Sequence, residues 1–183
     1  MRVLFIYPNT YSDGCMPLGI AMLSAVLKEA GHEIQLFDTT FFNKKSGETN
    51  KLGEKHLIFK KTDLDIKLDK SDMKEEFRKA INNFKPDLIA ISATSINYSL
   101  GLKLLKSING TVYAEVPVVV GGSHPTVVPD KVVAEDGIDI ICIGEGEGAM
   151  LELCNRMEAH EDITNIKNLW IKKNGKIFKN GHW

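Results

Sequence analysis

Short, mostly apolar runs recur along the chain, and they constrain its fold more than any other feature. The runs occupy residues 3–6, 88–91, 117–120 and 138–143, and each gives way to glycine, proline or serine within two residues. Such runs are typical of strands that are buried on both faces of a parallel sheet. Residues 33–37 instead alternate polar and apolar side chains, which predicts an edge strand.

Between these strands, the apolar residues follow helical spacing. Pro17 stands where a first helix would begin, and Gly31 stands where it would end. Ser71 is the expected N-cap of a second helix, and a short helix is expected over 130–135. The predicted apolar faces consist of Leu18, Met22, Ala25 and Val26; Met73, Phe77, Ile81 and Phe84; Leu100, Leu104 and Ile108; and Met150, Leu153, Cys154 and Met157.

Strands that alternate with helices predict an α/β fold of the flavodoxin-like (Rossmann-like) type. Five parallel strands in the order 2-1-3-4-5 would carry helices on both faces, because such crossovers are right-handed. Residues 169–178 indicate a C-terminal β-hairpin around Asn174-Gly175. We therefore expect an α/β domain over residues 1–160, a hairpin or linker over 161–183, and a solvated insertion over 43–71.

The composition argues against several classes of function. The formal net charge is -1 at pH 7, so no overall field attracts nucleic acid or an anionic membrane. No apolar run approaches the roughly 20 residues that span a bilayer, and the N-terminal run is too short for a signal peptide. Cys15, Cys142 and Cys154 are widely spaced, which indicates a reducing compartment. We expect a cytoplasmic protein without nucleic-acid or membrane partners.

The loops that follow the predicted strands would meet at one edge of the sheet, where ligands bind in this fold. A glycine pair lets a ligand approach the backbone closely, hydroxyls bond polar groups without adding charge, and a helix N-terminus offers N–H donors. The candidate binding residues are Asn9, Asp38, Ser92, Ala93, Thr94, Ser95, Gly121, Gly122, Ser123, His124, Gly144, Glu145, Gly146 and Glu147. No catalytic residue and no metal ligand is predicted in this chain.

Each of these residues also has a purely structural interpretation. Gly121-Gly122 can form a tight turn between a strand and a loop, and the hydroxyls of the 92–95 loop can cap the helix that follows. His124 before Pro125 can be a surface loop residue. Glu145 and Glu147 can stabilise a helix dipole at a helix N-terminus. No single motif decides between these interpretations.

Taken together, the motifs resemble the N-terminal cobalamin-binding domain of cobalamin-dependent radical S-adenosylmethionine enzymes. The resemblance extends from Arg2 to about Phe178, and its most specific parts are the Gly-Gly-x-His-Pro-Thr and Gly-Glu-Gly-Glu blocks. In order, the matching segments are Pro17-Leu18-Gly19-Ile20-Ala21, Leu27-Lys28-Glu29-Ala30-Gly31-His32-Glu33, Lys85-Pro86-Asp87-Leu88-Ile89-Ala90-Ile91-Ser92, Val119-Val120-Gly121-Gly122-Ser123-His124-Pro125-Thr126 and Gly144-Glu145-Gly146-Glu147.

The resemblance implies that the domain holds the nucleotide tail of cobalamin. Gly121 and Gly122 would admit the tail, Ser92 and Thr94 would bond it, and residues 144–147 would line the rim. A valine in place of Gly121 or Gly122 would then block binding while the fold stays stable. The corrin would face a C-terminal radical domain outside this chain, which would supply S-adenosylmethionine and a 4Fe-4S cluster for methyl transfer or related radical chemistry.

Two departures from related patterns refine this expectation. Cobalamin domains of the methionine synthase and mutase type use Asp-x-His-x-x-Gly, whose histidine ligates cobalt, whereas residues 38–43 here read Asp-Thr-Thr-Phe-Phe-Asn. The resemblance therefore implies base-off cobalamin without a histidine ligand. Cys15, Cys142 and Cys154 lack the Cys-x-x-x-Cys-x-x-Cys spacing of the radical enzymes, so this chain cannot build their cluster.

Other functions remain open at this point. A flavodoxin-like protein could bind a flavin or nucleotide at the same edge, although no Gly-x-Gly-x-x-Gly follows the first strand. A phosphorelay receiver would need a phosphorylatable Asp where residues 92–95 stand. A degenerate member of the cobalamin family would keep the fold without binding the cofactor. No motif in the sequence names a substrate.

Overall fold

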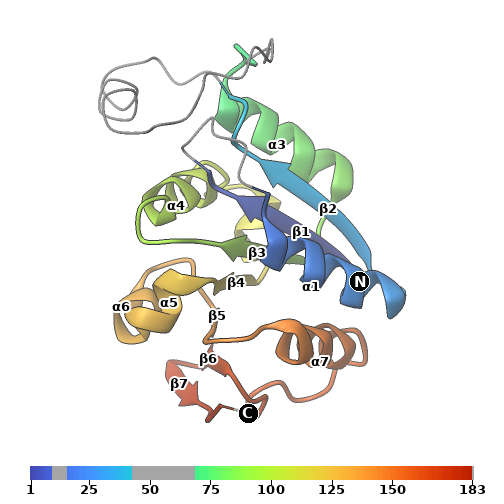
Figure 1. The fold of residues 1–183 in the computed structure, drawn as a ribbon, viewed down its shortest axis with the longest axis vertical. Helices are drawn as coiled ribbons and strands as arrows, with labels where there is room; N and C mark the ends of the chain where they lie inside the picture. The colour runs from blue at the N-terminus through green and yellow to red at the C-terminus, as the bar shows by residue number, and fades with distance from the viewer. Residues whose placement is uncertain (10–15, 43–68, 183) are drawn as a thin grey trace, which may run out of the picture.

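A computed structural model describes residues 1–9, 16–42 and 69–182 of the chain (Figure 1). Most of the predicted insertion over 43–71, and Cys15 in the loop after the first strand, lie outside these residues. The elements are β1 (Arg2–Tyr7), α1 (Leu18–Glu29), β2 (Glu33–Asp38), α3 (Met73–Phe84), β3 (Leu88–Ser92), α4 (Tyr98–Lys106), the 3-10 helix η1 (Val112–Glu115), β4 (Val118–Gly121), α5 (Ser123–Val127), α6 (Pro129–Ala134), β5 (Ile140–Cys142), α7 (Glu147–Glu158), β6 (Leu169–Lys173) and β7 (Lys176–Lys179).

One sheet runs through the molecule in the order β2-β1-β3-β4-β5-β6-β7. The strands β1 to β5 are parallel, in the predicted order 2-1-3-4-5, and β6 and β7 are antiparallel. Their carboxyl ends therefore share one edge of the sheet, which we call the rim. β2 forms the predicted edge strand. The fold class expected from the sequence is confirmed.

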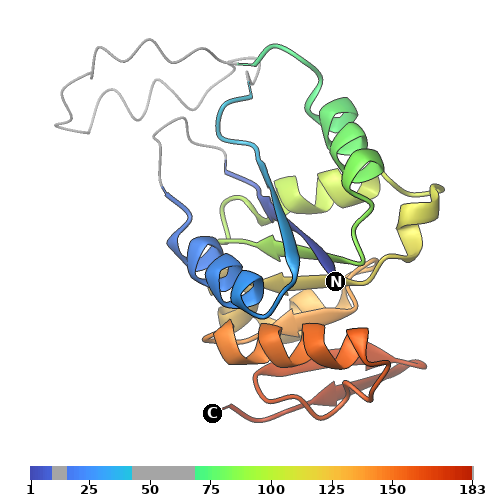
Figure 2. The same cartoon turned by 90° about the vertical axis from the view of Figure 1, so that its right-hand side faces the viewer.

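Alternating side chains of the parallel strands feed two apolar cores, one on each face of the sheet. Leu4 and Ile6 pack with residues of α3, α4 and α6 on one face. Val3 and Phe5 pack with residues of α1 and α7 on the other. The two views show α1 and α7 together on one side of the sheet (Figures 1 and 2). Burial on both faces explains why these strands lack polar alternation.

The first helix presents a different face to the sheet from the one predicted. Ile20 and Leu27 are its buried residues, whereas Leu18 and Met22 are 66% and 57% exposed. The prediction failed because the helix is apolar on nearly all sides, so a second stripe through Ile20 and Leu27 satisfies helical spacing equally well. Its end is as predicted, because Gly31 adopts the left-handed conformation with φ 89°.

Several element boundaries also differ from the sequence prediction. Asp72, not Ser71, caps α3 and accepts from the backbone N–H groups of Lys74 and Glu75. Residues 123–125, predicted as loop, begin the short helix α5, because proline is tolerated in a first helical turn. β5 spans only Ile140–Cys142, although Ile138 and Ile143 on either side are buried.

The C-terminal hairpin forms around the predicted turn and extends the sheet beyond β5. Asn174 and Gly175 have φ values of 52° and 72°, as a two-residue type I′ turn requires. The side chain of Lys179 forms an ion pair of 2.6 Å with Asp130 on α6 and lies 4.3 Å from the ring centroid of Trp170. The division of the chain at residue 160 stays a prediction.

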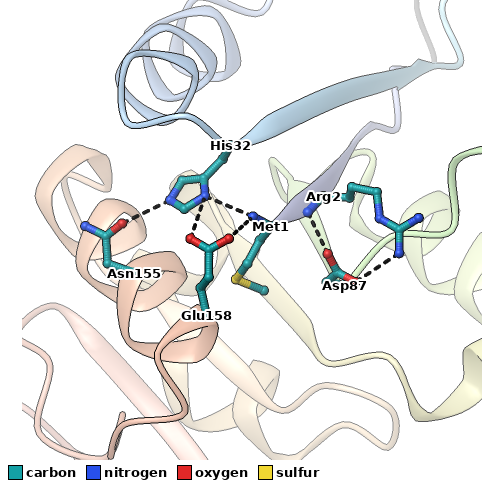
Figure 3. Close-up of polar contacts among 6 residues, drawn as sticks. All are labelled: Met1, Arg2, His32, Asp87, Asn155 and Glu158. Carbon is teal, nitrogen blue, oxygen red and sulfur yellow. Dashed lines mark hydrogen bonds and ion pairs between the residues drawn. The ribbon is translucent and has the colours of Figure 1, made fainter.

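Polar contacts fix the amino-terminal ends of the strands, opposite the rim (Figure 3). The α-amino group of Met1 lies 2.8 Å from a Glu158 oxygen and 3.2 Å from His32 Nδ1. The other ring nitrogen of His32 lies 3.1 Å from Asn155 Oδ1. Through these contacts α7 is tied to the start of β1 and to the turn before β2. Arg2 is bonded to Asp87 through its backbone N–H and its guanidinium group, at 2.7 Å and 3.2 Å.

Within the described part of the chain, no helix is long and apolar enough to cross a membrane.

Candidate cofactor-binding site

A pocket of about 130 Å³ opens at the rim on the face covered by α1 and α7. The ends of β3, β4 and β5 form its back wall, and the first turns of α1 and α7 close it in front. Its lining residues are Phe5, Gly19, Leu23, Ala90, Ile91, Ser92, Val119, Gly121, Gly122, Cys142, Gly144, Glu145, Gly146, Glu147 and Met150. The pocket therefore lies where ligands bind in this fold.

Three of the predicted loops contribute to this pocket. Ser92 ends β3, Gly121 ends β4 and is followed by Gly122, and residues 144–147 follow β5. Parallel strands bring these segments together although they are far apart in the sequence. Residues from α1 were not among the candidates. The sequence did offer a signal for Gly19, because a glycine is unusual in the first turn of an otherwise apolar helix.

The two central glycines have different roles. A Cβ on Gly122 would lie 2.6 Å from the carbonyl oxygen of Ala93, and the residue has φ 100°. This position requires glycine for the fold itself, so a valine at Gly122 would strain the backbone, contrary to the expectation that the fold stays stable. A Cβ on Gly121 would meet only the Cβ of Cys142, at 3.6 Å, which is an ordinary contact.

Backbone and side-chain bonds hold the loops of the pocket together. Ala93 is buried, and its N–H donates to Gly121 O at 2.9 Å. The hydroxyl of Thr126 donates to Gly122 O at 2.9 Å and accepts from the N–H of Gly144 at 3.1 Å. Ala93 and Thr126 are thus positioning residues, and neither lines the pocket.

A second group of predicted residues lies on the rim outside the pocket lining. Thr94 and Ser95 are exposed, and the Thr94 hydroxyl is bonded to Asn97 at 2.8 Å. Ser95 Oγ lies 3.0 Å from His124 Nδ1, and the His124 ring lies 4.3 Å from the Tyr98 ring. Burial and then Lys131 lower the pKa of His124, which favours the neutral imidazole at pH 7. Ser123, also exposed, opens α5 beside His124.

A third group links the ends of β1 and β2. Asn9 is buried, and its side-chain amide donates to Thr40 Oγ1 at 3.0 Å. Asp38 Oδ1 accepts from the backbone N–H and the hydroxyl of Thr40, at 2.8 Å and 2.5 Å. Neither Asn9 nor Asp38 lines the pocket. Their contacts fix the place from which the loop after β1 departs.

The charged side chains of the pocket lining are acidic. They are Glu145 and Glu147, and no lysine or arginine is among the described lining residues. Burial, then Glu147 and Glu145, raise the pKa of Cys142 to about 12, so its thiol is protonated at pH 7. The described lining therefore combines apolar walls with two acidic side chains.

Potential metal ligands do not cluster in this part of the molecule. Among the described residues, no group of three or more His, Cys, Asp or Glu side chains could hold a metal ion. The full sequence contains no Asp-x-His-x-x-Gly segment.

Comparison with known proteins identifies the family. The profile of the B12 binding domain matches residues 54–154, more than half of the chain. The chain belongs to the B12-binding domain family. The matched region includes β3, β4 and β5 and the glycine-rich loops that line the pocket. The resemblance to the cobalamin-binding domain of radical enzymes is thereby supported.

Relatives of this B12-binding domain include larger enzymes. It is 28% identical to an uncharacterized methyltransferase of Pyrococcus horikoshii, over 97% of this chain and 34% of that protein. It is 29% identical to the anaerobic magnesium-protoporphyrin IX monomethyl ester cyclase of Rubrivivax gelatinosus, over 86% of this chain and 25% of that enzyme. The chain thus spans about a quarter to a third of the length of these relatives.

Solved structures share the fold. A radical S-adenosylmethionine methyltransferase of Kitasatospora setae, solved with cobalamin and a 4Fe-4S cluster bound, superposes with a TM-score of 0.71. The two are 19% identical, and the match covers 96% of this chain and 28% of the other. At this identity, the likeness concerns the fold.

Proposed function

We propose that this B12-binding domain holds cobalamin with the nucleotide tail in the pocket beneath α1 and α7 and with the corrin across the rim. The observation that carries the proposal is an apolar pocket, lined in part by glycines, at the carboxyl edge of the sheet in a chain of this family. Nothing lies within 4 Å of a Cβ placed on Gly19, so the first turn of α1 leaves open space beside the pocket.

The lining of the pocket favours the cobalamin tail over a flavin or nucleotide phosphate. Phosphate sites in proteins use backbone N–H groups, lysine or arginine. Glu145 and Glu147 instead place negative charge where the loop after β5 meets the N-terminus of α7. An aromatic base suits the apolar interior, and the phosphate that links it to the corrin can stay outside in solvent.

This placement implies the base-off form. A base held between β4 and α7 cannot at the same time ligate a cobalt ion that lies over the rim. His124 is not proposed as its replacement, since the resemblance implies that no histidine ligates cobalt; its Nδ1 lies 3.0 Å from Ser95 Oγ, and its ring is tilted by 38° against the ring of Tyr98. When bound, cobalamin supplies a cobalt ion that can carry a one-carbon group.

In the longer proteins of this kind, we propose that a radical domain covers the corrin and supplies S-adenosylmethionine and a 4Fe-4S cluster. The length of the relatives supports this, because this chain matches only 34% and 25% of two of them. The relatives are a methyltransferase and a cyclase, so the reaction of the parent enzyme is methyl transfer or related radical chemistry.

Anaerobic titration with hydroxocobalamin, followed by desalting and a visible spectrum, tests the proposal. We expect one equivalent of retained cobalamin with a base-off spectrum. A base-on spectrum of retained cobalamin would contradict the placement of the tail. A colourless protein would favour the degenerate domain instead.

A further inference from the structure

The side chains inside the pocket offer few partners for hydrogen bonds. Phe5, Ala90 and Val119 form its sheet wall and are each no more than 3% exposed. Leu23 and Met150 approach from α1 and α7. Among the described lining residues, Ser92 is the one that carries a hydroxyl. The side chains of the walls can therefore satisfy very few polar atoms of a buried group.

The remaining polar side chains of the pocket add few hydrogen-bond partners for a neutral base. Glu145 belongs to the loop after β5 and Glu147 to the first turn of α7, and both are carboxylates that only accept hydrogen bonds when ionised. The Cys142 thiol is a weak hydrogen-bond donor and is almost completely buried. Among the side chains of the described lining, Ser92 is thus the one suited to pair a polar atom of a neutral base.

Natural cobamides differ in the base at the end of the nucleotide tail. Dimethylbenzimidazole has one ring nitrogen that is not bonded to the ribose, and two methyl groups. Adenine carries several further ring nitrogens and an amino group. A buried polar atom without a partner costs free energy, because it has lost its bonds to water.

We infer that this pocket selects the base of the cobamide, accepting an apolar benzimidazole and disfavouring a purine. The inference rests on the proposed function, because it assumes that the tail enters this pocket. Ser92 pairs the one free nitrogen of a benzimidazole, and the apolar walls contact its methyl groups. A purine in the same place leaves polar atoms facing Phe5, Val119 and Met150.

Equilibrium dialysis of the 183-residue chain against three corrinoids tests the inference. The probes are hydroxocobalamin, the adeninyl cobamide in its aquo form, and aquocobinamide, which has no nucleotide tail. We expect the adeninyl cobamide to bind at least about tenfold more weakly than cobalamin. We expect cobinamide to bind more weakly than cobalamin as well, because it cannot fill the pocket.

The outcomes separate the two proposals. Equal affinity for cobalamin and the adeninyl cobamide, with weaker cobinamide binding, overturns base selection and leaves the tail in the pocket. Equal affinity for all three corrinoids would show that the tail does not bind in the pocket, and it would overturn both the placement of the tail and base selection. Failure to bind any corrinoid overturns the proposed function, and base selection falls with it.

A matched pair of variants places the selection in the pocket. Val119 and Val120 are neighbours on β4, both are buried, and they belong to opposite cores. Val119→Thr adds a hydroxyl to the pocket. It should lower the ratio of the affinities for cobalamin and for the adeninyl cobamide several-fold. Val120→Thr adds the same group to the other face and should leave the preference unchanged. The inference would be contradicted if this ratio were unchanged in Val119→Thr, or if it fell in Val120→Thr alone.

Discussion

At the scale of single residues, the glycines of the pocket divide into those that the backbone needs and those that leave open space. Gly122 belongs to the first kind, because a Cβ there would collide with Ala93. Gly19 belongs to the second, because its side-chain position is empty. The sequence marks Gly121-Gly122 as a motif but does not distinguish between these roles, which depend on the neighbouring loop after β3.

Gly19→Leu should abolish or greatly weaken cobalamin binding without loss of stability. The leucine would project into the open pocket. Within a helix, leucine is more favourable than glycine by up to about 1 kcal/mol. Retention of hydroxocobalamin after desalting measures the effect, and urea unfolding checks the fold. Ala25→Leu, on the exposed part of the same helix, is the control and should bind normally. Full binding by Gly19→Leu would mean that the tail does not use this pocket.

Gly122→Ala should lower the free energy of unfolding by about 2–4 kcal/mol, because φ near 100° is strained for alanine and the methyl group meets Ala93. Gly121→Ala should cost about 1 kcal/mol or less, since its methyl group finds ordinary contact distance. Urea denaturation of both variants measures the difference. Similar losses in the two would show that the loops rearrange freely.

The two buried thiols predict a loss of stability at alkaline pH. Burial raises the pKa values of Cys142 and Cys154 from 9.0 to about 12 in the folded chain. Above pH 9 the unfolded chain releases these protons while the folded chain retains them, so stability falls by about 1.4 kcal/mol per pH unit for each thiol until the folded pKa is reached.

Urea unfolding between about pH 8 and pH 10 measures this slope. Cys154→Ala removes one of the two thiols, and its slope over this range should be shallower than that of the natural chain. An identical slope would show that the Cys154 thiol does not contribute.

At the scale of elements, strands were more predictable than helices. The run 3–6 could only be a buried strand, because its residues serve both cores. The buried face of α1 was not predictable, because Leu18 and Ile20 both begin apolar stripes and only the neighbouring pocket decides between them. The glycines at and after the ends of β4 and β5 allowed the pocket loops to be predicted. That Gly19 and Met150 also line the pocket could not be predicted, because it depends on how α1 and α7 pack.

The hairpin formed by β6 and β7 is expected to be necessary for the fold. Leu169 and Ile171 are buried beside β5, and β5 loses its antiparallel neighbour if the hairpin is removed. A chain that ends at residue 160 should therefore melt at a much lower temperature or bind a dye that reports exposed apolar surface. An unchanged melting temperature would support an independent domain over residues 1–160.

At the scale of the whole molecule, the described elements form one sheet, and the pocket opens at one of its edges. The opposite edge is fixed by the contacts of Met1, His32 and Glu158 (Figure 3). The described loops after β3, β4 and β5 are bonded to one another through Ala93 and Thr126, so we expect the pocket to be formed before a ligand binds. A preformed pocket reduces the ordering cost of binding.

The crystal structure of the chain with bound hydroxocobalamin tests the central claim most directly. We predict the benzimidazole in the pocket, between the ends of β3 and β4 on one side and α1 and α7 on the other, with its free nitrogen near Ser92 and away from cobalt. A benzimidazole that ligates cobalt, or a tail that lies outside this pocket, would contradict the account.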